Sequence, residues 1–187
     1  MIRSFIAIEL PTDIKNALGE LLEGLKTYGP RVSWVKKENI HLTIKFLGNI
    51  HEQKIKQIKE IMEKATKDIP HFSLKPIRLG AFPGSKRPRV IWVGLSGEIA
   101  LLEKFYVNLE KGLETLGFER EERKFKPHFT IGRVKKASHG ERLAEAIAKC
   151  GNFSTPSFLV QDIVLFKSEL HPQGAKYTAL ERVDLKK

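Results

Sequence analysis

The tetrapeptide HFTI, at residues 128–131, has one close copy in the chain, HLTI, at residues 41–44. Each copy places a histidine two residues before a threonine, with a large apolar residue after each of them. Successive side chains of a β-strand point to opposite faces, so the histidine and the threonine share one face. One copy alone would be typical of a polar strand surface, whereas two copies at half-chain separation indicate a duplicated lobe and a paired site.

The two copies predict how the halves of the chain meet. The four intervening apolar residues would bury the opposite face of each strand and fix it on the core: Leu42, Ile44, Phe129 and Ile131. If the lobes are related by a pseudo-twofold axis, the two strands can lie side by side at the centre. Their polar faces would then line one cleft with His41, Thr43, His128 and Thr130. Two residues span roughly 6.6 Å of strand, so a histidine and its threonine can touch one phosphate.

Apolar periodicity and turn residues predict the remaining elements. Strands are expected at 4–10, 32–35, 40–47, 72–82, 90–95, around 128–134, 157–167 and 176–183. Four helices are expected, at 12–25, 55–65, 99–116 and 141–149. Thr12 is expected to cap the first helix and Gly29-Pro30 to end it. Gly117 is expected to stop the third. Strands outnumber helices, and the helices fall between strand pairs. This pattern is typical of an α+β fold with mostly antiparallel pairing.

Composition limits the class of protein. The chain has 187 residues, 41% of them hydrophobic, which suits one compact domain over residues 1–187. The net charge of +11 favours a polyanionic partner such as nucleic acid or a phosphorylated metabolite, the alternative being a generally solvated basic surface. Cys150 is the only cysteine, so neither an intramolecular disulfide nor a cysteine-rich metal site can form. The first ten residues read as a strand and not as a signal peptide, and no apolar run is long enough to span a membrane. We expect a cytoplasmic monomer without membrane contact.

Two histidines and two threonines suit phosphodiester cleavage. One imidazole can act as base toward the attacking oxygen while the other acts as acid toward the leaving oxygen. Threonine hydroxyls can donate hydrogen bonds to the non-bridging oxygens. This chemistry requires no metal and no cofactor. The chain contains no HExxH, GxxxxGK[ST] or GxSxG motif. The other histidines are interpreted as surface residues: His51, His71, His139 and His171.

With its paired HxTx motifs, the chain resembles the two-histidine phosphoesterase superfamily, and within it the RNA 2′,3′-cyclic phosphodiesterase family, also called the 2′-5′ RNA ligase family. Further segments look like those of the family, in the same order: RSFIAIEL, ENIHLTIKFLG, GAFP followed by PRVIWVGL, FKPHFTIGRVK and SELHPQGAKYTAL. The resemblance therefore covers nearly the whole chain.

The resemblance implies a bilobed, pseudo-twofold fold, with antiparallel sheets flanking a central cleft and helices on the outside. It implies hydrolysis of a terminal RNA 2′,3′-cyclic phosphate to a 2′-phosphate. His41 would give a proton to the departing 3′ oxygen, His128 would activate water, and Thr43 and Thr130 would hold the phosphate. It also implies joining of a 2′,3′-cyclic phosphate end to a 5′-hydroxyl through a 2′-5′ bond, which differs from hydrolysis only in which hydroxyl attacks.

Four basic residues are further candidates for substrate binding. Simple alternation puts Lys45 on the His41 face and Arg133 on the face opposite His128, unless a bulge or the strand end redirects it. Arg87 and Arg89, in the loop PGSKRPR, could meet the RNA backbone or belong to a solvated hairpin loop.

Three aromatic residues, Trp34, Phe46 and Trp92, could stack on a base, although core packing is the stronger expectation for each. Two other functions stay open. One is an RNA-binding module without turnover. The presence of both histidines and both threonines argues against it. The other is a phosphodiesterase acting on a small nucleotide, which the charge of +11 disfavours without excluding.

Overall fold

The computed structural model describes residues 1–29, 31–135, 141–172 and 174–187. In chain order, the elements are β1 (Ile2–Glu9), α1 (Thr12–Lys26), β2 (Val32–Trp34), the 3₁₀ turn η1 (Lys37–Asn39), β3 (His41–Ile50), α2 (Lys54–Thr66), β4 (Phe72–Phe82), β5 (Val90–Gly97), α3 (Ile99–Glu114), β6 (Phe129–Val134), α4 (Glu141–Lys149), β7 (Phe158–Val160), β8 (Asp162–His171) and β9 (Gly174–Asp184). Within the described residues, none of the helices combines the length and the apolar character needed to cross a membrane.

Most predicted elements form where the periodicity places them, with three differences. Thr12 does not cap α1: Pro11 holds the cap position, without a side-chain hydrogen bond, and Thr12 is the first helical residue. Helix α3 ends at Glu114, before Gly117, which adopts a φ of +81°. The stretch predicted as one strand from 157 to 167 is two strands, because β7 pairs with β4 at one edge while β8 pairs with β1 in the other half. Pro30, part of the predicted stop of α1, lies outside the described residues.

The strands form one curled sheet in the order β7-β4-β5-β6-β3-β1-β8-β9, with β2 paired to β6. All pairs between these strands are antiparallel, as the α+β prediction requires. The order is symmetric about its centre, so β6 corresponds to β3, β5 to β1, β4 to β8 and β7 to β9. The predicted lobes are therefore two half-sheets, and they are joined between β3 and β6.

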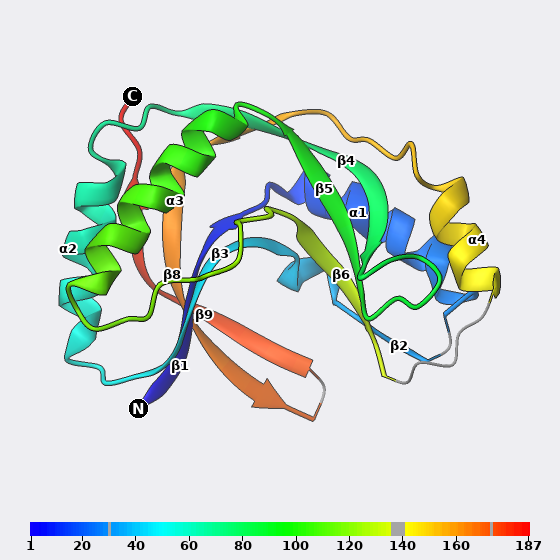
Figure 1. Ribbon diagram of the computed structural model, residues 1–187, viewed down its shortest axis with the longest axis horizontal. Coiled ribbons are helices and arrows are strands. Elements are labelled where there is room, and N and C mark those ends of the chain that lie inside the picture. The colour runs from blue at the N-terminus through cyan, green and yellow to red at the C-terminus, as the bar shows by residue number, and fades with distance from the viewer. Residues whose placement is uncertain (30, 136–140, 173) are drawn as a thin grey trace.

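Each half-sheet carries its own pair of helices on the outside. Helices α2 and α3 pack together beside β8 and β9, whereas α1 and α4 lie beside the β2, β4 and β6 half (Figure 1). Each helix buries one stripe of apolar residues at helical spacing. In α1 the stripe is Ile14, Leu18, Leu22 and Leu25, and in α3 it is Leu102, Phe105, Leu109 and Leu113.

The sheet is apolar on both faces at its centre. Ile6 and Ile8 of β1 belong to the main core under the helices. Phe5 and Ala7, which alternate with them, belong to a second cluster on the other face, together with Val164, Phe166 and the partly buried Tyr177. The second cluster therefore lies on the face that the helices leave uncovered.

Candidate active site

Strands β3 and β6 bring the two HxTx motifs together at the centre of the sheet. Their one paired position is Leu42 opposite Phe129, and both side chains are fully buried in the main core. Continuing this antiparallel register by one residue in each direction sets His41 beside Thr130 and Thr43 beside His128. The four polar residues are all partly exposed, as expected on the face opposite the core. The prediction that the two strands lie side by side is confirmed.

A β-bulge follows each HxT motif and reverses the face of the residues beyond it. In the first copy, Ala7 pairs with Thr43 and the neighbouring Ile6 pairs with Lys45, so Ile44 has no partner in β1. Ala7 and Ile6 are consecutive in β1 and therefore point to opposite faces. Lys45 must then lie on the core face and not, as alternation predicted, on the face of His41.

The side chain of Lys45 is held in a buried ion pair on that core face. Its Nζ lies 2.8 Å from Oε1 of Glu110 in α3, and the side chains are 11% and 3% exposed. The same Nζ donates a hydrogen bond of 2.8 Å to the carbonyl of Glu119, and the N–H of Glu121 donates one of 3.0 Å to Glu110. Lys45 therefore anchors the segment that leads from α3 toward His128, which corrects its predicted place on the site face.

The second bulge turns Arg133 to the site face, whereas the first turns Lys45 to the core face. Trp92 pairs with Thr130 and Val90 pairs with Arg133, while Ile131 has no partner in β5. Trp92 and Val90 are two residues apart in β5 and share a face, so Arg133 shares the face of Thr130. The alternative that a bulge redirects Arg133 toward the site is the one that the structure adopts.

The bulge in the first copy turns Phe46 to the site face. Phe46 pairs with Phe5, which belongs to the second cluster, and the two ring centroids are 6.0 Å apart. Its side chain is 60% exposed, so the expectation of core packing is wrong for this residue. Phe46 stands five residues after His41, as Arg133 stands five residues after His128. The sequence names both residues as candidates but carries no signal of their faces, because a bulge depends on the register with the neighbouring strand.

The other sequence candidates are partly buried or exposed. Trp34 is partly buried against the main core, and Trp92 packs against Phe82 with centroids 5.1 Å apart. Arg87 and Arg89 are exposed in the loop between β4 and β5. His51 and His171 are exposed and His71 is partly exposed, whereas His139 lies outside the described residues.

The two histidine rings are oriented in the same way. Nδ1 of His41 lies 2.7 Å from the carbonyl oxygen of Asn39, and Nδ1 of His128 lies 2.7 Å from that of Lys126. A carbonyl oxygen can only accept, so both Nδ1 atoms carry the proton and donate it. In the neutral ring, each Nε2 is then the unprotonated nitrogen.

Aromatic packing shapes the environment of both rings. The ring of His41 stacks on Phe5 at 4.7 Å, and the ring of His128 meets Phe82 edge-on at 5.2 Å. Burial lowers the pKa of His41 below its usual value, and Lys15 adds to the decrease, while the Asn39 carbonyl and Glu9 oppose it. Burial likewise lowers the pKa of His128, with Arg133 adding to the decrease and the Lys126 carbonyl opposing it. Both imidazoles are therefore neutral more readily than free histidine.

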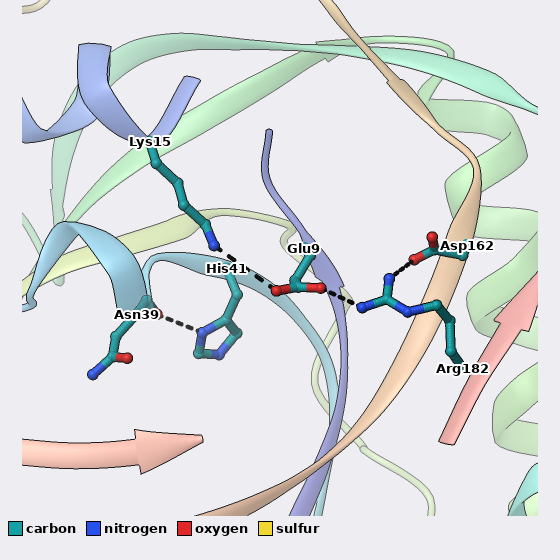
Figure 2. Close-up of polar contacts among 6 residues, drawn as sticks. All are labelled: Glu9, Lys15, Asn39, His41, Asp162 and Arg182. Carbon is teal, nitrogen blue, oxygen red and sulfur yellow. Dashed lines mark hydrogen bonds and ion pairs between the residues drawn. The ribbon is translucent and has the colours of Figure 1, made fainter. Parts of the chain in front are cut away.

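A chain of charged residues lies beside His41 and was not predicted from the sequence. Glu9 is 3.9 Å from Lys15 of α1 and 2.5 Å from Arg182 of β9, and Arg182 is 2.6 Å from Asp162 of β8 (Figure 2). All four residues line a hollow of about 310 Å³. Neither histidine lines this hollow or the larger one, of about 760 Å³, between α1 and η1. The paired histidines are therefore located by the geometry of the strands and not by a cavity.

Comparison with known proteins agrees with this arrangement. The family described as LigT like Phosphoesterase matches the chain twice, over residues 8–92 and 93–177, in line with the duplicated fold. A Thermotoga maritima protein named RNA 2′,3′-cyclic phosphodiesterase is 37% identical over 95% of this chain and 92% of its own length. A protein of the same name from Methanocaldococcus jannaschii is 34% identical over 96% and 98%.

Solved structures share the fold. A crystal structure of a Thermus thermophilus protein superposes with a TM-score of 0.81 at 25% identity, covering 99% of this chain and 98% of its own. Escherichia coli LigT complexed with 3′-AMP superposes with a TM-score of 0.76 at 24% identity, covering 100% and 99%. The two matched segments together span most of the 187 residues, one for each HxTx motif. This chain belongs to the LigT-like phosphoesterase family.

Proposed function

We propose that the protein hydrolyses RNA 2′,3′-cyclic phosphodiester ends to 2′-phosphomonoesters by metal-independent acid–base catalysis. The observation that carries the proposal is the matched pair of histidines, each with Nδ1–H fixed on a carbonyl and Nε2 left for the substrate. The names of the relatives from Thermotoga and Methanocaldococcus support the choice of substrate. The net charge of +11 suits an RNA partner. Cytoplasmic location and a monomeric state are part of the same proposal.

The reaction requires one proton transfer on each side of phosphorus. Nε2 of His128 accepts a proton from water as the water oxygen forms a bond to phosphorus. Protonated Nε2 of His41 gives its proton to O3′ as the P–O3′ bond breaks. The products are a 2′-phosphate and a 3′-hydroxyl, and solvent returns the histidines to their starting states. Thr43 and Thr130 donate hydrogen bonds to the non-bridging oxygens.

The same groups would support 2′-5′ joining when the 5′-hydroxyl of a second RNA takes the place of water. That hydroxyl would lose its proton to His128, and the P–O3′ bond would break as before. Hydrolysis is the primary proposal, because the curated relatives are named for it.

The pH dependence follows from the two histidines. The base His128 must be neutral, so activity rises as pH passes upward through its pKa; the acid His41 must be protonated, so activity falls above its own pKa. Burial lowers both values. We therefore expect a bell-shaped profile of kcat/KM with its maximum below about pH 6.5. The measurement is initial rates on a short cyclic-phosphate RNA in excess chelator. Activity that requires an added divalent ion would contradict the mechanism.

Arg133 and Phe46 give the site two different flanks. Arg133, exposed beside His128, suits the charge of the phosphate. Phe46, exposed next to the Phe5 ring on which His41 stacks, offers a ring face on which the terminal base can stack. Arg87 and Arg89 are proposed to contact the RNA backbone further along, from the exposed β4–β5 loop.

Phe46→Ala is expected to weaken binding of a 2′-phosphorylated RNA end by on the order of 10-fold, because base stacking is worth about 1–3 kcal/mol. Phe46→Trp should retain the affinity of the wild type. Val107→Ala, at an exposed apolar residue of α3, is the matched control and should bind normally. The measurement is equilibrium binding at fixed salt. Equal affinity of Phe46→Ala and the wild type would exclude the stacking role.

A further inference from the structure

The hairpin formed by β8 and β9 (Figure 1, orange) contacts the His41 end of the site through residues of β9. It contributes Tyr177, which is partly buried and belongs to the second cluster. The ring of Tyr177 meets His41 edge-on, with centroids 5.1 Å apart and an interplanar angle of 89°. Because Phe5 covers one face of the same imidazole, Tyr177 completes its aromatic surroundings. The hairpin is therefore in direct contact with the proposed proton donor.

Asn39 connects the hairpin and His41 through a second route. Its backbone carbonyl accepts the Nδ1–H of His41 at 2.7 Å (Figure 2). Its side-chain amide donates a hydrogen bond of 2.7 Å to the carbonyl of Ala175, 136 residues away in the sequence. Ala175 stands two residues before Tyr177 on β9. The contacts close a ring that runs from His41 to Asn39, to the hairpin and back to His41.

The second motif has only part of this arrangement. His128 also donates its Nδ1–H to the carbonyl of the residue two positions earlier, Lys126. The side chain at that position is a lysine and is exposed. The aromatic ring against His128 is Phe82, which comes from β4 of the same half-sheet. The two imidazoles are therefore fixed in the same tautomer, but His41 is held additionally by a segment from the end of the chain.

We propose that the β8–β9 hairpin is a positioning element for His41, and that Asn39 is the residue that couples the two. This inference rests on the proposed function, in which His41 supplies a proton to the leaving oxygen. Asn39 acts through His41 and does not contact the substrate. With the hairpin in place, the imidazole cannot rotate away from the bound phosphate, and less of its surface is open to water. Small displacements of a reacting group lower rates strongly, so this restraint serves turnover more than binding.

The test uses Asn39→Ala, which removes the side-chain amide and keeps the carbonyl. Release of the hairpin hydrates His41, so its pKa should rise toward 6.5, while that of His128 stays unchanged. Glu9 and Lys15, the charged groups beside His41, are unaltered, so the shift reports hydration. We expect kcat to fall by about 10- to 100-fold with little change in KM. NMR titration of the imidazoles and steady-state kinetics on a cyclic-phosphate RNA measure the two effects.

Asn16→Ala is the matched control. Asn16 belongs to α1, and its side-chain oxygen accepts a hydrogen bond of 3.1 Å from Lys37. Lys37 lies in the η1 turn, as Asn39 does, so this bond also holds η1 but does not involve the hairpin. Its loss should change neither the titration of His41 nor kcat. Tyr177→Leu should reproduce the His41 shift without altering Asn39, and Tyr177→Phe should keep wild-type behaviour because it keeps the ring.

Two outcomes would overturn the proposal. One is an unchanged His41 titration and kcat in both Asn39→Ala and Tyr177→Leu. The other is an equal shift of the pKa values of both histidines, which would indicate that the whole site has loosened. If Asn39→Ala does not fold, the same two measurements on Tyr177→Leu test the proposal. The proposed function fails separately, if the wild type does not cleave cyclic-phosphate RNA. In that case the NMR titration still decides whether the hairpin and Asn39 position His41.

Discussion

Replacing His41 or His128 by alanine is expected to slow hydrolysis of a cyclic-phosphate RNA end by on the order of 10²–10⁴-fold. That factor is the usual contribution of a positioned acid or base. RNA affinity should stay nearly intact, because neither imidazole has to be charged to hold the backbone. The measurement is single-turnover hydrolysis beside equilibrium binding for each variant.

Further variants separate the histidines from the threonines. The double histidine variant should lose much less than the product of the two single losses, because groups that act as a unit are not additive. Thr43→Ala and Thr130→Ala should each cost on the order of 10–10³-fold, since each removes one donor to the phosphate oxygens. Wild-type turnover in either histidine variant would refute the mechanism for that substrate.

Lys45→Ala is expected to destabilise the protein by about 3–5 kcal/mol, because it leaves the carboxylate of Glu110 buried and unpaired. For a chain of this length, that corresponds to a decrease in Tm of roughly 6–20 °C. Thermal and denaturant unfolding measure the effect. The variant should also loosen the segment around Glu119 and Glu121 that precedes His128.

An exposed ion pair supplies the control. Lys26 and Glu23 lie 2.5 Å apart on the surface of α1 with side chains 45% and 68% exposed, so Lys26→Ala should cost less than about 1 kcal/mol. Replacing Lys45 and Glu110 together by Met and Leu should recover much of the lost stability. A Lys45→Ala protein of wild-type stability but reduced RNA affinity would restore Lys45 to the binding surface.

The sequence predicts which face of the sheet each side chain of the HxT motifs occupies. It does not predict the face of the residues that follow the motifs. Leu42 and Phe129 alternate with the polar residues of HxT, and alternation alone puts them in the core. A bulge, by contrast, depends on the register with a neighbouring strand, which the local sequence does not contain. The bulges at Ile44 and Ile131 therefore reverse what alternation predicts for the residues that follow them.

The charged chain beside His41 could not be predicted for a different reason. Glu9 and Arg182 are 173 residues apart and meet only because β1, β8 and β9 are neighbours in the folded sheet. The same holds for Asn39 and Ala175. Local composition identifies such residues only as exposed polar positions. Their partners become apparent once the strand order is known.

The equivalent bulges in the two copies bear on which isomer the enzyme makes. A cyclic phosphate offers two ester oxygens, O2′ and O3′, and a symmetric pair of imidazoles could expel either. The bulges give the symmetric frame two different flanks, because the aromatic Phe46 follows His41 in β3 and the cationic Arg133 follows His128 in β6. A nucleotide whose base rests on the aromatic flank enters in one orientation only. Regioselectivity would then be set five residues after each histidine, by side chains that exchange no proton.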